Sequence, residues 1–253
     1  MNVFVSKSRA ALGELAAHDI ADTLRQGLRE KEELRIVLAA APSQSEMLAA
    51  LRREKEIDWQ RITAFHMDEY IGLAKGAPQR FANWLMKEFV DHVPLGRFEA
   101  IDPGADPEGT CRAYTALLTE APIDVVLLGI GTNGHLAFND PPADLNDPIA
   151  VKVVTLDRMC REQQVLDDCF ATFDAVPQQA ITLTVPTLLS GHWLFCCVPG
   201  IHKRAAVQST LESPISGECP ATALRNHSYC NLYLDHDSSP TSISHEREDD
   251  KRL

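Results

Sequence analysis

Short runs of apolar residues alternate with segments of helical periodicity along most of this chain, and this alternation constrains the fold more than any other feature. The apolar runs show little polar alternation, which is typical of strands covered by helices on both faces. They occupy residues 35–41, 62–66, 123–128, 151–156, 193–198 and 231–234. Helix-period segments lie between them at 43–55, 79–89 and 107–120. The order predicts an α/β fold with a doubly wound, mostly parallel, Rossmann-like sheet flanked by helices.

The N-terminal segment fits the same scheme. Residues 2–5 predict a short strand, and the helix expected after it has Ser6 as its candidate N-cap. Apolar residues then recur at helical spacing: Leu12, Ala16, Ile20, Leu24 and Leu28. No repeat or low-complexity linker divides the chain, so we expect one domain over residues 1–235. Residues 236–253 are polar and charged with few apolar anchors, and predict a charged C-terminal tail, mobile or helical and solvated.

The charge balance limits the classes of partner. With 24 Lys and Arg residues against 36 Asp and Glu residues, the 253-residue chain has a formal net charge of -12. A field of this sign repels nucleic acid and anionic membranes, so we expect neither as a partner, and a phosphorylated ligand has to be held by local contacts. No apolar run reaches the length of a membrane span, and charged residues interrupt the N-terminal segment before a secretory core could form. We therefore expect a cytoplasmic protein.

The seven cysteines give no sign of a metal centre. They are scattered without CxxC pairs, and Cys196 and Cys197 stand side by side within an apolar run. We interpret them as reduced core residues and expect no metal site.

The first two candidate sites follow two of the predicted strands, because ligands of open parallel sheets collect at the carboxyl ends of strands. The loop Pro42-Ser43-Gln44-Ser45 follows the first of them. Ser43 and Glu46 have the spacing of a capping box, so this loop either caps a helix or binds a phosphate at the helix N-terminus. Asp68 and Glu69 follow the strand that ends at His66, where one carboxylate could serve as a base or both could be solvated loop residues.

A glycine-rich loop follows the run 123–128 and contains the richest candidate chemistry. It reads LGIGTNGHLAFNDPP and formally contains GxGxxG after a strand. A dinucleotide site would need a long helix at the third glycine, and Pro141 and Pro142 argue against one. The glycines can instead let backbone approach a ligand while presenting His135, with Asp140 close enough to orient its imidazole.

Together these segments resemble the glucosamine-6-phosphate deaminase family. The segment FHMDEYIGL is similar to the family's F-N-M-D-E-Y-x-G-L, and LGIGTNGHLAFNDPP is similar to its G-x-G-x-D-G-H-x-A-F-N-E-P loop. Weaker likenesses lie in VPQQAITLTVPTLLSG and PGIHKRAAV. The resemblance runs from the strand before Pro42 to Leu234.

The resemblance implies a role for each matching residue. Asp68 would be the base that moves a proton between C2 and C1 of the open-chain sugar, His135 would open the ring with the help of Asp140, and Lys203 would grip the phosphate. The substrate and its phosphate would lie against the following residues: Pro42, Ser43, Gln44, Ser45, Gly131 and Gly134. The resemblance implies neither a metal nor a redox cofactor. Glu69 and Tyr70 belong to the motif without a step assigned to them.

Three departures from the family pattern stand out. Asn133, grouped here with the catalytic residues, stands where the family carries an aspartate, so His135 lacks one anionic neighbour. The phosphate loop lacks the family's glycine-rich T-G-x-T. Arg158 and Arg161 are both candidates for the family's phosphate-binding arginine.

The function expected from these patterns is isomerisation with deamination, which converts glucosamine 6-phosphate, or a close amino-hexose 6-phosphate, to fructose 6-phosphate and ammonia. A 6-phosphogluconolactonase is the alternative of the same fold, although its loop typically continues T-A-S-L-F-P. A non-catalytic sugar-phosphate sensor is the alternative of a different class, although sensors normally carry a DNA-binding module. The substrate configuration and the number of subunits stay open, with a homo-oligomer compatible with the sequence.

Overall fold

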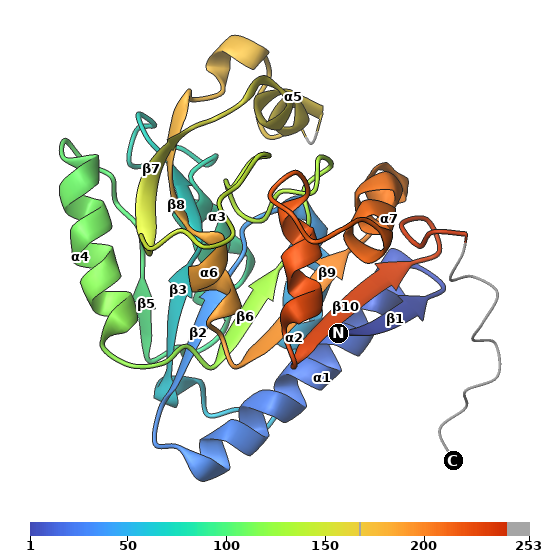
Figure 1. Cartoon of the computed structure of the whole chain (residues 1–253). Helices are drawn as coiled ribbons and strands as arrows, with labels where there is room; N and C mark the ends of the chain where they lie inside the picture. The colour runs from blue at the N-terminus through green and yellow to red at the C-terminus, as the bar shows by residue number, and fades with distance from the viewer. Residues whose placement is uncertain (167, 242–253) are drawn as a thin grey trace.

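The larger sheet has seven strands, all parallel to their neighbours (Figure 1). The computed structural model describes residues 1–166 and 168–241. In spatial order the strands are β1 (Asn2–Ser6), β10 (Cys230–Asp235), β9 (Trp193–Val198), β6 (Val125–Leu128), β2 (Leu34–Leu38), β3 (Ile62–His66) and β5 (Arg97–Glu99). Five of the predicted apolar runs form strands of this sheet, which confirms the predicted doubly wound, mostly parallel architecture.

Helices cover both faces of this sheet. One face packs against α1 (Arg9–Glu30), α2 (Ser45–Leu51) and α3 (Phe81–Glu88), and the other against α4 (Pro107–Thr119), α6 (Val185–Leu189) and α7 (Arg204–Glu212). Alternate residues of a strand serve the two faces: Ile36 and Leu38 join the core under α1, whereas Val37 joins the core under α4. Burial on both sides explains why the central strands are continuously apolar.

A second, three-stranded sheet is antiparallel and lies beside the first. It consists of β4 (Asp68–Tyr70), β8 (Gln179–Leu183) and β7 (Val151–Thr155), in that order. The run 151–156 was expected in the main sheet, and this placement is wrong. β7 is partly exposed along most of its length, so its apolar residues are covered on one face of the strand and not on both. Helix α5 (Arg158–Leu166) follows β7 and lies at the top of Figure 1.

Two predicted helix starts also need correction. Ser8, not Ser6, caps α1, and its Oγ accepts a hydrogen bond from the Ala11 amide at 3.2 Å. Ser43 is no N-cap, because it lies in a 3₁₀ turn that precedes α2. Glu46, its expected capping-box partner, pairs with Arg9 at 2.6 Å.

The 3₁₀ turns of the described chain are Pro42–Gln44, Trp59–Arg61, Val90–His92, Phe173–Ala175, Ile201–Lys203 and Pro220–Asn226.

The C-terminal segment continues past β10 as a packed turn. Ser238 and Ser239 are buried, and the Ser238 amide donates to Asp235 Oδ1 at 2.8 Å. Residues 242–253 of the predicted tail lie outside the described residues, and the domain boundary at 235 stays a prediction.

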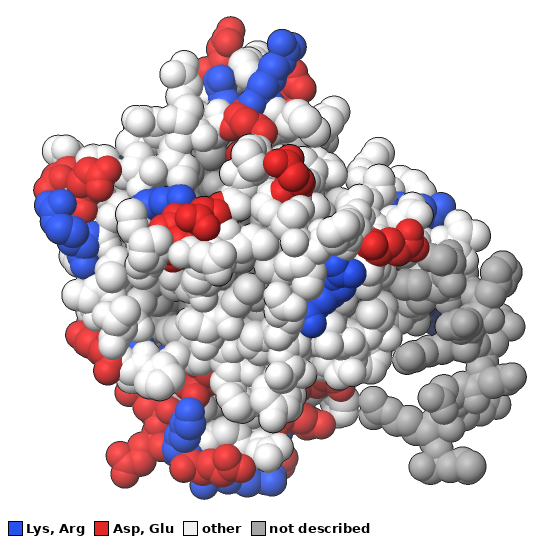
Figure 2. All heavy atoms as spheres, in the orientation of Figure 1, with Lys and Arg blue, Asp and Glu red and all other residues white. Residues whose placement is uncertain are grey.

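Charged side chains are distributed unevenly over the surface. On the face in Figure 2, acidic and basic side chains are interspersed near the edges and leave a broad uncharged area between them. No helix in the described part of the chain is long and apolar enough to cross a membrane.

Candidate active site

A cavity of about 430 Å³ opens at the carboxyl ends of the central strands β9, β6, β2 and β3. The chain order of the strands reverses here, because β3 follows on one side of β2 and β6 on the other. Such a switch point is the usual ligand site of an open α/β sheet. Seven predicted site residues line the cavity: Pro42, Ser43, Gln44, Asp68, Gly131, His135 and Lys203. Ser45, Asn133, Gly134 and Asp140 are not part of its lining.

Asp68 is the first residue of β4, two residues beyond the end of β3. Its side chain lines the cavity from a buried position. Burial raises the pKa of this carboxyl well above the usual value for aspartate, and the neighbouring Glu69 charge raises it further. A carboxylate with a raised pKa is a stronger base, as proton abstraction from carbon requires.

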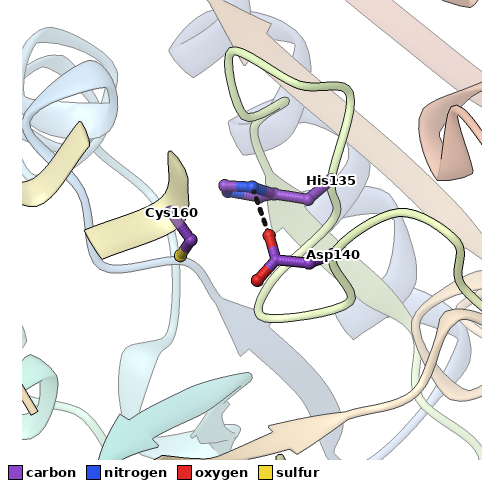
Figure 3. A group of neighbouring side chains, drawn as sticks. All are labelled: His135, Asp140 and Cys160. Carbon is purple, nitrogen blue, oxygen red and sulfur yellow. Dashed lines mark ion pairs between the residues drawn. The ribbon is translucent and has the colours of Figure 1, made fainter. Parts of the chain in front are cut away.

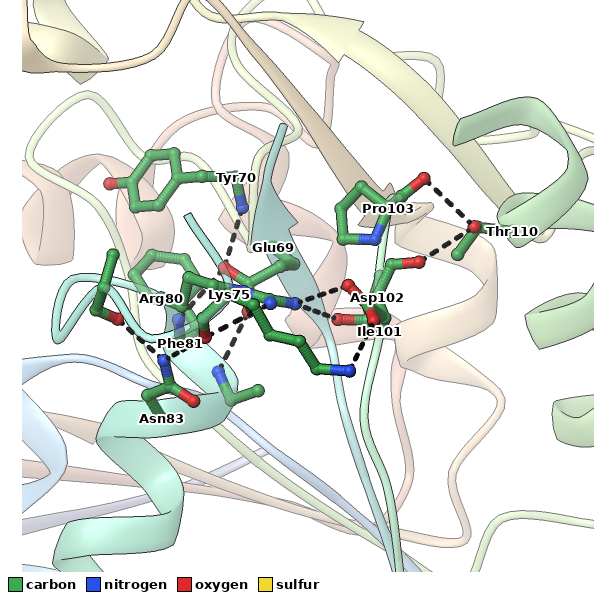
Figure 4. A network of polar contacts seen from close by, with 12 residues as sticks. Glu69, Tyr70, Lys75, Arg80, Phe81, Asn83, Ile101, Asp102, Pro103 and Thr110 are labelled. Carbon is green, nitrogen blue, oxygen red and sulfur yellow. Dashed lines mark hydrogen bonds and ion pairs between the residues drawn. The ribbon is translucent and has the colours of Figure 1, made fainter. Parts of the chain in front are cut away.

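Glu69 is not part of the cavity lining, and it holds the start of α3 (Figure 4). Its Oε1 accepts from the amides of Tyr70 and Phe81 at 2.9 and 3.0 Å, and its Oε2 accepts from Ala82 at 3.0 Å. Arg80 Nε lies 3.7 Å from Oε2. Burial raises the pKa of Glu69, although these three amides and Arg80 oppose the change. The side chain thus fixes the strand that carries Asp68 to a helix that forms the wall of the cavity.

His66 and Tyr114 fix the end of β3 from the other side. The Ile101 amide donates to His66 Nε2 at 2.7 Å, and the Tyr114 hydroxyl accepts from the His66 amide at 2.9 Å. Burial lowers the pKa of His66 to about 3, so its ring stays neutral. Sequence reasoning missed both residues; a histidine inside an apolar strand and a tyrosine on the buried face of a helix were the available signals.

The loop after β6 is shaped by its glycines. A Cβ at Gly131 would lie 2.3 Å from the His135 ring, and a Cβ at Gly134, whose φ is +85°, would lie 2.6 Å from Cys219 Sγ. Residues 129–150 are all described and contain neither helix nor strand, so the helix of a dinucleotide site is missing. The loop therefore presents His135 to the cavity, as predicted.

Asp140 lies beside His135, with Oδ1 3.1 Å from the imidazole Nδ1 (Figure 3). Among the described residues, Nδ1 has no hydrogen-bond partner of normal alignment. Burial alone would raise the pKa of Asp140, but contacts with His135 and Asn133 hold it below its usual range. The expected pairing of Asp140 with His135 is present.

Asn133, which stands where the family carries an aspartate, contacts Asp140 and the backbone of His135. Its Nδ2 donates to Asp140 Oδ1 at 3.3 Å, and its Oδ1 accepts from the His135 amide at 3.1 Å. The amide suits this position because it donates to the carboxylate that pairs with His135.

Three residues of the predicted phosphate loop, Pro42, Ser43 and Gln44, also line the cavity. Gln44 is buried, and its Nε2 donates to Ser43 Oγ and to the Cys197 carbonyl, both at 3.1 Å. Lys203 reaches the cavity from the 3₁₀ turn after β9. The loop and Lys203 therefore face one cavity, although they lie far apart in the sequence.

Neither candidate arginine lines this cavity. Arg158 is exposed and pairs with Glu162 at 2.6 Å, while Arg161 donates to the carbonyls of Phe173 and Val176. Lys203 and Lys87 are the cations among the described lining residues. The lining also includes residues that sequence reasoning missed: Phe81, Trp84, Phe138, Gln163 and Gln164. Their helical or loop positions gave no chemical signal.

The comparisons with known proteins agree with this arrangement. The chain is 30% identical to glucosamine-6-phosphate deaminase 1 of Bacillus subtilis (strain 168) over 244 residues, 94% of this chain and 98% of the relative. It is 30% identical to a glucosamine-6-phosphate deaminase of Streptomyces avermitilis over 240 residues, covering 93% and 90%. A solved structure of a monomeric glucosamine-6-phosphate deaminase superposes with a TM-score of 0.85 at 30% identity, covering 94% of this chain and 98% of that one.

A more distant neighbour shows the fold alone. The 6-phosphogluconolactonase of Trypanosoma brucei has a TM-score of 0.76 at 18% identity, covering 94% of this chain and 97% of that one. The family model of glucosamine-6-phosphate isomerases and 6-phosphogluconolactonases matches residues 7–232. With the Asp68 and His135 segments converging on one cavity inside this match, the chain belongs to the glucosamine-6-phosphate isomerase/6-phosphogluconolactonase family.

Proposed function

We propose that this protein is a glucosamine-6-phosphate deaminase, which converts an amino-hexose 6-phosphate to a ketose phosphate and ammonia. The observation that carries the proposal is the position of Asp68 and His135 on one cavity, with Asp140 paired to His135. The deaminase relatives at 30% identity over nearly the whole chain support the same activity.

The proposed reaction divides between these side chains. His135 moves the proton that ring opening requires, and Asp140 stabilises the charge that this places on the imidazole. Asp68 then takes the proton from C2 and returns it at C1, while the substrate ammonium loses one proton and the C1 oxygen gains one, which leaves an iminium at C2. Water adds to C2 and the C2–N bond breaks, so one water is consumed and one ammonia is released per ketose phosphate. The enzyme is thus an isomerase in its proton transfer and a hydrolase in its overall balance.

Lys203 is proposed to hold the phosphate, together with the loop that contains Ser43 and Gln44. Its support is local, because a net charge of -12 gives a phosphorylated substrate no long-range attraction. A charge-assisted hydrogen bond contributes about 1.5–3 kcal/mol, so Lys203→Ala should weaken binding of sugar phosphate and of inorganic phosphate about 10–100-fold. Lys87→Ala, at the α3 wall of the same cavity, is the matched control. Equal affinities in the parent and the Lys203 variant would remove the lysine from the phosphate site.

A single panel tests the proposal against its alternatives. Amino-hexose 6-phosphates in gluco and galacto configuration are assayed for ammonia and ketose phosphate together, and 6-phosphogluconolactone is assayed for hydrolysis. We expect ammonia and ketose phosphate in equal amounts. Lactone hydrolysis without ammonia would make the protein a lactonase, and tight sugar-phosphate binding without turnover would make it a sensor. A cytoplasmic location, the lack of a nucleic-acid partner and the number of subunits stay predictions.

A further inference from the structure

Cys160 lies against the His135–Asp140 pair and has no part in the proposed reaction. One ligand atom from each of the three side chains, the Cys160 sulfur, an Asp140 oxygen and a His135 nitrogen, all lie within 4.8 Å of one another (Figure 3). Cys160 comes from the first turn of α5, across the cluster from the loop that carries the other two. We propose that these three side chains form a binding site for a thiophilic divalent cation such as Zn²⁺, and that the bound cation blocks the active site.

The positions of the three groups are set by the fold rather than by chance contact of mobile side chains. The Cys160 amide donates to Asp157 Oδ1 at 2.6 Å, and the Asp157 amide lies 3.5 Å from Asp140 Oδ2. Asp157 therefore ties the start of α5 to the loop. Cys160 is buried, and the side chains of His135 and Asp140 are each only 11% exposed.

The spacing suits a tetrahedral cation. Zinc bonds of about 2.3 Å to sulfur and about 2.0–2.1 Å to nitrogen or oxygen place neighbouring ligand atoms roughly 3.3–3.6 Å apart. His135 Nδ1 and Asp140 Oδ1 already lie 3.1 Å apart, and Nδ1 has no well-aligned hydrogen-bond partner among the described residues. The Cys160 sulfur lies within 4.8 Å of the other two ligand atoms, a separation at most about 1 Å longer than this spacing.

The charge around the sulfur favours a cation. Asp140 belongs to the same cluster, and the Asp157 carboxylate accepts from the Cys160 amide at 2.6 Å, so two carboxylates beside the thiol attract a compensating positive charge. A divalent cation supplies that charge. When it binds, the sulfur–hydrogen bond breaks, the proton passes to solvent and the sulfur bonds to the metal as a thiolate.

Occupation of this site would stop the proposed reaction, because His135 and Asp140 cannot both bind a metal and serve ring opening. Inhibition by the cation rests on the proposed function. Binding of the cation does not, so the two can be measured separately.

The direct experiment is a titration of the metal-free full chain with Cd²⁺, followed by the thiolate-to-metal charge-transfer band in the ultraviolet. The parent should saturate at a single site. Cys160→Ser should lose the band and weaken Cd²⁺ binding by at least about 100-fold. Loss of a residue that only hydrogen-bonds to a metal ligand lowers metal affinity by about 10–100-fold, and loss of a ligand itself should cost more. Cys160→Val keeps apolar packing and should behave in the same way. Cys169→Ser, which removes a thiol that lines the same cavity, is the matched control and should keep both the band and the affinity.

The second measurement is ammonia formation at buffered free Zn²⁺, with each variant normalised to its own metal-free rate. The parent and Cys169→Ser should be inhibited over the same Zn²⁺ range, whereas both Cys160 variants should need at least about 100-fold more. Unchanged Cd²⁺ binding in the Cys160 variants, or loss of the band in Cys169→Ser alone, would overturn the site. A parent that binds Cd²⁺ at Cys160 but forms no ammonia without metal would leave the site standing and refute the proposed deaminase.

Discussion

Asp68 and Asp140 are two aspartates of one active site whose surroundings shift their pKa values in opposite directions. Asp68, at the end of β3, is buried beside Glu69, and both effects raise its pKa. Asp140, in the loop after β6, is also buried, but His135 and Asn133 hold its pKa below the usual range. The contrast shows that burial alone does not decide the state of a carboxyl group; the charge and hydrogen bonds of its neighbours do. It also supports different tasks: proton transfer for Asp68 and constant negative charge for Asp140.

The largest effect should follow Asp68→Asn, which keeps the size of the side chain but removes the proposed base. Turnover should fall by about 10²–10⁴, the usual contribution of a positioned acid–base group, while substrate affinity is retained. Ammonia release measures turnover, and calorimetry with the substrate measures affinity. Asp91→Asn, on the exposed turn after α3, is a control. Near-normal turnover of Asp68→Asn would show that the base lies elsewhere and would end the contrast between the two aspartates.

A smaller loss is expected for Asp140→Asn, because the charge beside His135 assists a proton transfer without carrying the proton. Turnover should fall by about 10², the lower end of the range for acid–base groups. Asp144→Asn, an exposed change in the same loop, should leave turnover within about twofold, since surface substitutions away from the site are usually small in effect. An active Asp140→Asn enzyme would remove Asp140 from the chemistry.

Glu69→Gln tests the origin of the raised pKa of Asp68. Loss of the Glu69 charge should lower that pKa, so the acidic limb of the kcat/KM profile should move to lower pH, because Asp68 then ionises at lower pH. The same change replaces an acceptor of the Ala82 amide by a donor and should cost about 1–3 kcal/mol of unfolding free energy. Glu88→Gln, at the other end of α3, is the control for stability. If the acidic limb does not move, burial alone raises the pKa of Asp68.

The smallest effect is expected for Asn133→Asp. The new carboxylate would replace a donor 3.3 Å from Asp140, and repulsion between like charges should raise the pKa of Asp140. Turnover near neutral pH should change by less than about tenfold. When the pH is lowered, the variant should lose activity at a higher pH than the parent, because Asp140 with a raised pKa takes up its proton at a higher pH. Turnover measured against pH decides the matter; a profile that superimposes on the parent would show that Asn133 does not set the charge state of Asp140.

Much of the fold was predictable because central strands of a parallel sheet need apolar residues on both faces. Residues 62–66 and 193–198 were predicted with the bounds observed for β3 and β9. The run 151–156 is also mostly apolar, although it contains Lys152, and its neighbours in space show that it is a half-covered antiparallel strand. Sequence patterns give the covered length of a strand more reliably than the sheet to which it belongs.

The candidate site was predictable where special residue types gather at strand ends, as with Asp68 and His135. Of the two alternatives for Ser43, the helix cap is wrong because a 3₁₀ turn takes the place of the first helical turn, and local spacing does not distinguish the two. The partners of Glu69 are backbone amides, which every residue but proline supplies, so no pattern of side chains indicates them. Cys160 meets Asp140 only because β7 and Asp157 return the chain to the loop.

The capping of α3 by Glu69 has a consequence for changing the substrate range. The Glu69 carboxylate accepts from the amides of Tyr70, Phe81 and Ala82. The two ends of the segment 71–80 are therefore held by the same side chain. Pro78 and Gln79 from this segment line the cavity. Insertions or deletions between the two anchored ends would reshape that wall while the base keeps its position. Residues 71–79, which leave Arg80 beside Glu69 unchanged, are therefore the segment in which new loop lengths can be screened for altered substrates without disturbing the proton transfer.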